Sequence, residues 1–334
     1  MGMPLKGMPL NVSDTEKTEM SSSTRQTRAP RITLLAAALA LACGAAAASD
    51  DSGAVHRSKA RAAHTQRSQD AQAAPEAVAA LQNGAYGASV FAVTPWTPKV
   101  SDTWQWQLTG TINTSYNVVV YDIDLFDAPD SVITTLHNQG KHVVCYFSAG
   151  SGENWRPDYS KFKASDLGNP LDGWAGEKWV DTRSANVRSI MASRLDLAKT
   201  RGCDGVEPDN VDGYQNNPGF PLTASTQSDY NKYLATQAHA RGLKVGLKND
   251  VDQLSTLASS FDFAINEQCH EYSECGGYTV FTNAGKPVFN AEYKKAYVNN
   301  PSTRATMCAS ARAANLRTLV LPLDLNDAFR YSCD

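Results

Sequence analysis

Two acidic residues, Asp209 and Glu267, have the positions and chemistry expected of a pair that breaks a covalent bond. Each follows a short apolar run, Asp209 in the string Glu-Pro-Asp-Asn (207–210) and Glu267 in Asn-Glu-Gln-Cys (266–269). Glycosidic bonds are cleaved when one carboxylic acid protonates the leaving oxygen and another carboxylate attacks or stabilises the anomeric carbon. The two acids are far apart in the sequence, so the fold must bring them together.

Further polar and aromatic residues follow apolar runs and form a predicted substrate-binding set. An isolated acid on a loop usually only faces solvent, whereas a desolvated acid needs a partner or a purpose. Aromatic side chains at strand ends can stack on sugar rings, although most aromatic residues in strands belong to the core. The predicted set is Trp106, Asp122, Asp124, Tyr146, Glu207, Asn210, Lys248, Asn249, Asp250, Glu292 and Tyr293.

Other site chemistries lack the spacing that they require. The acidic segments 122–127 and 209–213 do not supply the alternating ligands, the glycine and the final Glu of an EF-hand. The His and Cys residues lack zinc-site spacing. The string Ser-Ala-Gly-Ser-Gly (148–152) lacks the first glycine of a Gly-x-Ser-x-Gly nucleophile elbow. We therefore expect neither a metal nor a cofactor.

Nine short apolar runs are candidate strands, and stretches with helical periodicity lie between several of them. The candidate helices span 131–139, 186–200, 228–241 and 302–315, and Gly140, Gly202 and Gly242 stand where a C-cap glycine belongs. The candidate strands are 103–108, 118–123, 142–148, 178–181, 205–207, 244–247, 261–266, 287–291 and 318–323.

This alternation of strands and helices predicts an α/β fold, a (β/α)8 TIM barrel. The carboxyl ends of barrel strands meet at one mouth, which would gather the polar residues named above. A doubly wound open sheet gives a similar rhythm, but no glycine-rich phosphate loop follows the first strands. Nine candidates exceed eight barrel positions, so 178–181 or 103–108 is expected to lie outside the barrel.

The N-terminal third divides into a targeting segment and a linker. Residues 1–49 contain Arg28 and Arg31, then an apolar run too short to span a bilayer, then small residues, which is the pattern of a secretory signal peptide. The sequence around Cys43 also allows a lipid anchor at that residue. Residues 50–95 are rich in Ala, Ser and Gln and predict a disordered tether, which leaves 96–334 as the catalytic domain.

Cysteine content and charge agree with export. Six cysteines lie in the predicted catalytic domain, which suits three disulfides in a secreted or periplasmic protein, with Cys269 and Cys275 as the most local pair. Fifteen connectivities are possible for six cysteines. The acidic surplus lies after residue 100, where it can favour a cationic ligand, and no basic patch suggests nucleic-acid binding.

These strings together resemble glycoside hydrolase family 114, the endo-α-1,4-polygalactosaminidases, from Trp104 to the C-terminus. The matching strings are Trp-Gln-Trp-Gln-Leu (104–108), Tyr-Asp-Ile-Asp-Leu-Phe-Asp (121–127), Cys-Tyr-Phe-Ser-Ala-Gly (145–150), Asp-Gly-Val-Glu-Pro-Asp-Asn-Val-Asp (204–212), Gly-Leu-Lys-Asn-Asp (246–250) and Asn-Glu-Gln-Cys (266–269). The resemblance implies a (β/α)8 barrel that acts on partially deacetylated α-1,4-linked galactosamine polymers, with Asp209 and Glu267 as catalytic acids.

Such a polymer is cationic, which would give the acids Asp122, Asp124, Asp250 and Glu292 ammonium groups to bind. By comparison with other α-glycosidase barrels, Asp209 is expected to attack the anomeric carbon and Glu267 to act as acid and then base, with retention of configuration. Two alternatives remain open, a non-catalytic polysaccharide-binding barrel and a hydrolase of the same fold with another amino-sugar polymer as its substrate. A monomer is expected.

Overall fold

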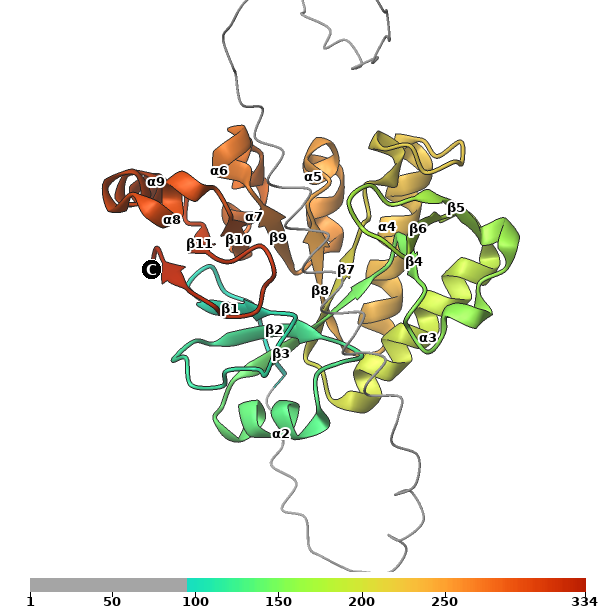
Figure 1. The fold of residues 1–334 in the computed structure, drawn as a ribbon, viewed down its shortest axis with the longest axis horizontal. Coiled ribbons are helices and arrows are strands. Elements are labelled where there is room, and N and C mark those ends of the chain that lie inside the picture. The colour runs from blue at the N-terminus through green and yellow to red at the C-terminus, as the bar shows by residue number, and fades with distance from the viewer. Residues whose placement is uncertain (1–94) are drawn as a thin grey trace, which may run out of the picture. The chain divides into compact units, whose positions relative to one another are not determined.

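The computed structural model describes residues 95–334, which form a curled, mostly parallel β-sheet with helices on its outer face (Figure 1). From β1 to β11 every neighbouring pair is parallel, and β12 pairs antiparallel with β11. In spatial order the strands are β1 (Trp104–Gln107), β2 (Val120–Asp124), β3 (His142–Ser148), β7 (Gly205–Asp209), β8 (Lys244–Lys248), β9 (Phe263–Glu267), β10 (Val288–Glu292), β11 (Arg317–Val320) and β12 (Tyr331–Ser332). The fold is therefore α/β and TIM-like.

The four predicted helices are all present, and their ends follow ordinary capping chemistry. The Ser184 side chain accepts backbone N–H bonds at the start of α3 (Ala185–Arg201), and Gly202 ends this helix with a left-handed φ of 87°. Asn300 caps α9 (Pro301–Ala313), which begins with Pro301. The α-helices are α2 (Asp130–Asn138), α3 (Ala185–Arg201), α4 (Ala224–Ala240), α5 (Leu254–Leu257), α6 (Cys269–Tyr272), α7 (Thr279–Thr282), α8 (Lys295–Asn299) and α9 (Pro301–Ala313). Six 3-10 turns are η1 (Tyr159–Lys161), η2 (Ala164–Asp166), η3 (Gly213–Gln215), η4 (Val251–Gln253), η5 (Ala258–Ser260) and η6 (Cys275–Tyr278).

All nine candidate strands exist, and the one outside the main sheet is 178–181. It corresponds to β6 (Glu177–Val180), which pairs with β4 (Ser151–Glu153) and β5 (Leu167–Pro170) in a separate three-stranded sheet. This small sheet lies in the connection between β3 and α3. The sequence analysis missed β4, β5 and β12, because they are short and their residues, such as Ser-Gly-Glu in β4, carry no apolar alternation.

The predicted (β/α)8 barrel is confirmed only in part. In the described residues the backbone ladder ends at β1 on one side and at β12 on the other, and side chains bridge the two ends. The indole nitrogen of Trp104 donates to the Arg317 carbonyl at 2.8 Å, and Arg330 donates to the Trp104 carbonyl at 2.9 Å. No helix joins β1 to β2, since residues 108–119 are mostly small and polar and lack an apolar face.

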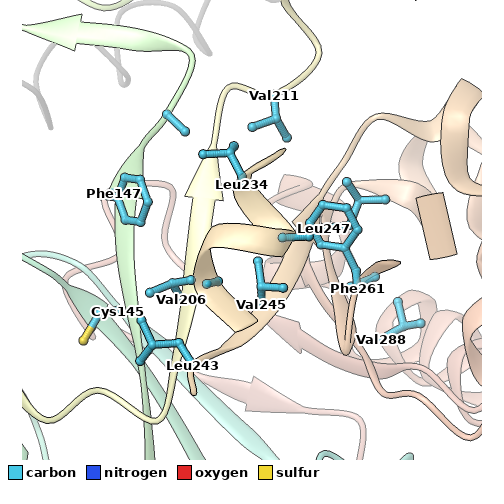
Figure 2. Packing of buried hydrophobic residues seen from close by; sticks show 14 of the residues in the cluster. Cys145, Phe147, Val206, Val211, Leu234, Leu243, Val245, Leu247, Phe261 and Val288 are labelled. Carbon is cyan, nitrogen blue, oxygen red and sulfur yellow. The ribbon is translucent and has the colours of Figure 1, made fainter. Parts of the chain in front are cut away.

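Alternating side chains along the strands build two apolar layers. Val206, Val245 and Leu247 face outward and pack against helix residues such as Leu234 (Figure 2). A second cluster, which includes Trp104, Val120, Phe263 and Phe289, fills the inside of the curled sheet. Because side chains alternate with a period of two, the neighbours of the outward-facing residues, among them Glu207 and Lys248, point to the inside.

Three disulfides join Cys145 to Cys203, Cys269 to Cys275 and Cys308 to Cys333. The predicted local pair is therefore confirmed. Among the described residues no helix has both the length and the apolar character that a membrane crossing needs. The predicted signal peptide at 1–49, the alternative anchor at Cys43 and nearly all of the predicted tether at 50–95 lie outside the described residues.

Candidate active site

Lys248, the last residue of β8, is the centre of the candidate site. Its Nζ lies 2.9 Å from Glu207 Oε1, 3.3 Å from Asp209 Oδ1 and 3.4 Å from Glu267 Oε2. The two predicted catalytic acids therefore share one ammonium group, and their nearest oxygens lie no farther apart than the sum of the last two distances, 6.7 Å. Burial lowers the pKa of Lys248, but the carboxylates of Asp209, Glu207 and Glu267 outweigh it and hold the pKa well above its ordinary value.

Strand order and sharp turns bring the acids to this point. Strands β7, β8 and β9 are neighbours in the sheet, and Asp209, Lys248 and Glu267 are their last residues. The residue that follows each strand has a left-handed φ, of 60° at Asn210, 48° at Asn249 and 66° at Gln268. Asn is among the residues that adopt this conformation most readily. The chain therefore turns away at once and leaves the three strand ends open.

Hydrogen bonds orient both acids. Asp209 Oδ2 accepts from the Tyr146 hydroxyl at 3.0 Å, and Asp209 Oδ1 accepts from the Asn210 N–H at 2.7 Å. Glu267 Oε1 accepts from the Tyr293 hydroxyl at 2.6 Å. The side chains of Asp209 and Glu267 remain 18% and 29% exposed, against 2% for Lys248. Both acids are thus fixed in place and still accessible from outside.

The remaining predicted residues near Lys248 form the wall and floor of the site. The Trp106 ring centroid lies 4.6 Å from Lys248 Nζ, a cation–π distance. The Asn249 side chain accepts the Glu267 N–H at 3.0 Å, and the Asn210 side chain donates to Ser148. Glu207 and Asp122 are fully buried on the floor, beneath Asp209 and Glu267.

Comparisons with known proteins show the family of this chain. The model of glycoside-hydrolase family GH114 matches residues 88–334. The chain belongs to this family. Its fold and sequence are similar to those of Aspergillus fumigatus Ega3, solved in complex with galactosamine, with 46% identity over 71% of this chain and 97% of that one and a TM-score of 0.68. The glycoside hydrolase domain of PelA from Pseudomonas aeruginosa is 14% identical over 69% of this chain and 97% of that one, with a TM-score of 0.52, and supports the fold alone. A search of curated proteins found no match.

Three acids that the sequence analysis placed in the binding set, Asp124, Asp250 and Glu292, point to other partners. Asp124 accepts from both terminal nitrogens of buried Arg156, at 2.9 and 2.6 Å. Asp250 accepts from the Asn231 side chain at 2.9 Å and from the Tyr214 hydroxyl at 3.3 Å. Burial, followed by the charge of a nearby acid, raises the pKa of Asp250 to about 7. We do not carry Asp124 or Asp250 into the proposed substrate contacts.

Glu292 lies on the outer face of β10. Ala291, the residue before it, is the register partner of Glu267 and packs in the inner cluster. The side chain of Glu292 therefore points to the opposite face of the sheet. Its Oε1 accepts the His270 N–H at 2.8 Å, and burial raises the pKa of the Glu292 carboxyl to about 7. A substrate at the mouth would not meet this side chain, so Glu292 is also left out.

Asp212 is an acid that the predicted set omitted and that lies close to Asp209 and Glu267. Burial and the charge of Asp209 raise the pKa of Asp212 to about 6, while Lys248 lowers it. Its carboxylate is held by its own backbone N–H. The available signal was its place three residues after Asp209, at the end of the string 204–212.

A metal is not suggested by the side-chain clusters of residues 95–334. One group, Cys269, His270 and Cys275, has possible ligand atoms within 4.8 Å of one another. Its two cysteines form a disulfide and therefore offer no thiolate. This cluster does not have the donor chemistry of a zinc site.

Proposed function

We propose that this GH114 protein is an exported enzyme that cleaves within α-1,4-linked galactosamine-rich polysaccharide, with Asp209 and Glu267 as its catalytic acids. One observation carries the proposal. The two carboxylates end neighbouring strands, share the Lys248 ammonium and remain partly exposed. The similarity to Ega3, solved with galactosamine, supports the choice of sugar.

The contacts of the two acids support different roles. Asp209 receives donors from Lys248, Tyr146 and its own following N–H, which fix its oxygens in the orientation that a nucleophile needs. Glu267 is the more exposed of the two and is placed to meet the leaving oxygen. In the first step an Asp209 oxygen bonds to the anomeric carbon as the glycosidic bond breaks, and Glu267 gives its proton to the leaving oxygen. Water then attacks the same carbon, Glu267 takes up the water proton, and Asp209 is released.

The spacing of the acids is compatible with retention of configuration. Retaining enzymes hold their carboxyl groups about 5 to 5.5 Å apart and inverting enzymes about 6.5 to 9.5 Å. The 6.7 Å upper bound between Asp209 Oδ1 and Glu267 Oε2 concerns one pair of oxygens and includes the first range. This spacing and the donors that orient Asp209 support our proposal of a double displacement through a glycosyl ester on Asp209.

Asp212 is the acid best placed to hold an ammonium group of the substrate. It lies beside Asp209 at the mouth, is partly exposed, and with a pKa of about 6 is ionised in neutral solution. A free amine on the sugar would give it a cationic partner. The acidic surplus after residue 100 would also attract such a polymer.

Export and a monomeric state are also part of the proposal. Three disulfides suit an oxidising compartment, either outside the cell or in a periplasm. Mass-spectrometric mapping of the disulfides in the exported protein would check this, since six free thiols would contradict it. Whether the protein is released or anchored through Cys43 would be settled by the mass of its mature N-terminus.

The proposed reaction is tested by reducing-end release from galactosamine polymers of graded acetylation, with the wild type beside Asp209→Asn. Release by the wild type alone, rising with the share of free amines, is expected. Binding of polymer without release would favour the non-catalytic barrel. Release that requires complete acetylation would contradict the cationic substrate and point to another amino-sugar polymer.

A further inference from the structure

The floor of the site contains a carboxyl pair that the proposed mechanism does not use. Asp122 on β2 and Glu207 on β7 both point into the curled sheet, and their side chains are 1% and 0% exposed. The charged and titratable groups that act on this pair are Lys248, Asp209 and Tyr146. Four carboxyl groups, those of Asp122, Glu207, Asp209 and Glu267, thus gather around the Lys248 ammonium.

The hydrogen bonds of the pair leave three oxygens without a donor. Neither carboxyl oxygen of Asp122 meets an N–H or hydroxyl group of the described residues, and the same holds for Glu207 Oε2. Burying an unpaired carboxylate costs several kcal/mol. The two side chains are nevertheless within hydrogen-bonding reach of each other. A proton between them would provide the missing donor.

Lys248 decides which of the two carries that proton. Its Nζ lies 2.9 Å from Glu207 Oε1, so the negative charge is stabilised on Glu207. No ion pair joins Asp122 to a cation of the described chain. Burial, and then the charge of Glu207, raise the pKa of Asp122 well above its ordinary value. Two carboxylates in contact cannot both ionise at neutral pH, as in other paired acids.

We propose that Asp122 is a neutral carboxylic acid whose O–H donates to Glu207, and that it acts through Glu207 to position Lys248 between Asp209 and Glu267. Asp122 is a positioning residue, because it lies below the catalytic acids and touches neither of them. The claim that Asp122 affects the rate rests on the proposed function, whereas the claim that Asp122 is protonated does not. Without the donated proton, Glu207 would repel Asp122 and its hold on Lys248 would change.

Infrared spectroscopy tests the protonation without using activity. At pH 7 the wild-type spectrum minus that of Asp122→Asn should contain the C=O stretch of a protonated, deuterium-exchangeable carboxylic acid. The bands of other acids with raised pKa values, Asp250 and Glu292, cancel in this difference. Asp204→Asn is the matched control. Burial raises the pKa of Asp204, but hydrogen bonds that include those from His137 and the Val143 N–H lower it to about 2, so this variant should keep the band. A difference spectrum between the wild type and Asp122→Asn that lacks this band would overturn the proposal.

Kinetics then test the positioning role. Asp122→Leu removes the donor at similar size and should lower kcat by about 10²-fold with a smaller change in KM. Asp122→Asn is neutral and keeps an N–H donor, so it should recover at least about tenfold of that loss. If Asn is as damaging as Leu, the negative charge of Asp122 matters and the proposal is wrong. If the wild type releases no reducing ends, the proposed function is wrong. The infrared measurement still tests the protonation of Asp122 in that case, because it does not depend on activity.

Discussion

Two buried cations of this protein have the same number of acidic partners and different consequences. Lys248 meets Glu207, Asp209 and Glu267, and Arg156 meets Asp124, Glu153 and Asp127. Each cation is almost fully buried, at 2% and 1% exposure. A count of charged neighbours would not separate the two clusters.

The two clusters differ in the donor group and in what covers it. The Arg156 guanidinium uses its planar fork, with Nε on Glu153 and both terminal nitrogens on Asp124, and joins the loop after β4 to the end of β2. The Lys248 ammonium is a point charge between three strand ends, and two of its acids reach the mouth. We infer that the Arg156 cluster stabilises the frame and that the Lys248 cluster performs the chemistry.

The largest expected effect comes from the same substitution at both cations. Lys248→Met should lower the rate of reducing-end release by about 10²- to 10³-fold per folded molecule, because the ammonium that orients both acids is gone. Arg156→Met should lower the free energy of unfolding by about 3 to 5 kcal/mol, since it leaves buried carboxylates unpaired. Urea denaturation and steady-state kinetics on both variants check this. Equal rate losses would remove the distinction between the clusters.

The disulfides extend the comparison between frame and site. Replacing Cys145 and Cys203, which are 58 residues apart, with Ala should cost about 4 kcal/mol of unfolding free energy and leave the rate per folded molecule nearly unchanged. Replacing Cys269 and Cys275, six residues apart, should cost only about 2 kcal/mol. The second change begins two residues after Glu267, so it should also lower kcat by about tenfold. The reverse pattern would contradict this division.

Glu292, an acid outside both clusters, should show its role in the pH dependence of stability. Its pKa is raised from an ordinary 4.5 to about 7 in the folded protein, so its contribution to stability is present below pH 4.5 and is lost as the pH rises through 7. Glu292→Gln should therefore be more stable than the wild type at pH 8, by up to about 3 kcal/mol, and should not gain at pH 4. Urea denaturation across this range measures the difference.

Asp166→Asn is the control for that measurement. Burial raises the pKa of Asp166, but hydrogen bonds from Ser184, the Lys163 N–H and Asn186 lower it below its ordinary value, so its contribution is already complete at pH 5. Its variant should be less stable than the wild type and should run parallel to it between pH 5 and 8. If Glu292→Gln also runs parallel to the wild type, Glu292 does not titrate in this window.

The sequence predicted the strands better than it predicted the direction of single side chains. All nine candidate strands exist, because apolar runs and turn residues are local signals. Glu292 was assigned to the mouth as a strand-end acid, although its direction depends on the register between β9 and β10, which no local signal gives. Asp124 has its partner, Arg156, 32 residues away in a connection whose small sheet was not predicted.

Lys248 illustrates the same limit within the site. The sequence placed it among the binding residues, but its contacts require the ends of β7, β8 and β9 to be in register. Asp212 was missed because only the fold reveals how close it lies to Asp209 and Glu267. Element positions thus follow from local sequence, whereas partners across strands follow from packing.

The most direct test of the central claim compares Glu267→Gln with Glu153→Gln, the same change in the Lys248 and Arg156 clusters. Reducing-end release from a partially deacetylated galactosamine polymer would be measured per folded molecule. Glu267→Gln should lose about 10³-fold or more in rate, and Glu153→Gln should lose stability while its rate stays within about threefold of the wild type. A Glu267→Gln variant that still cleaves at the wild-type rate would contradict the assignment of the Lys248 cluster as the active site.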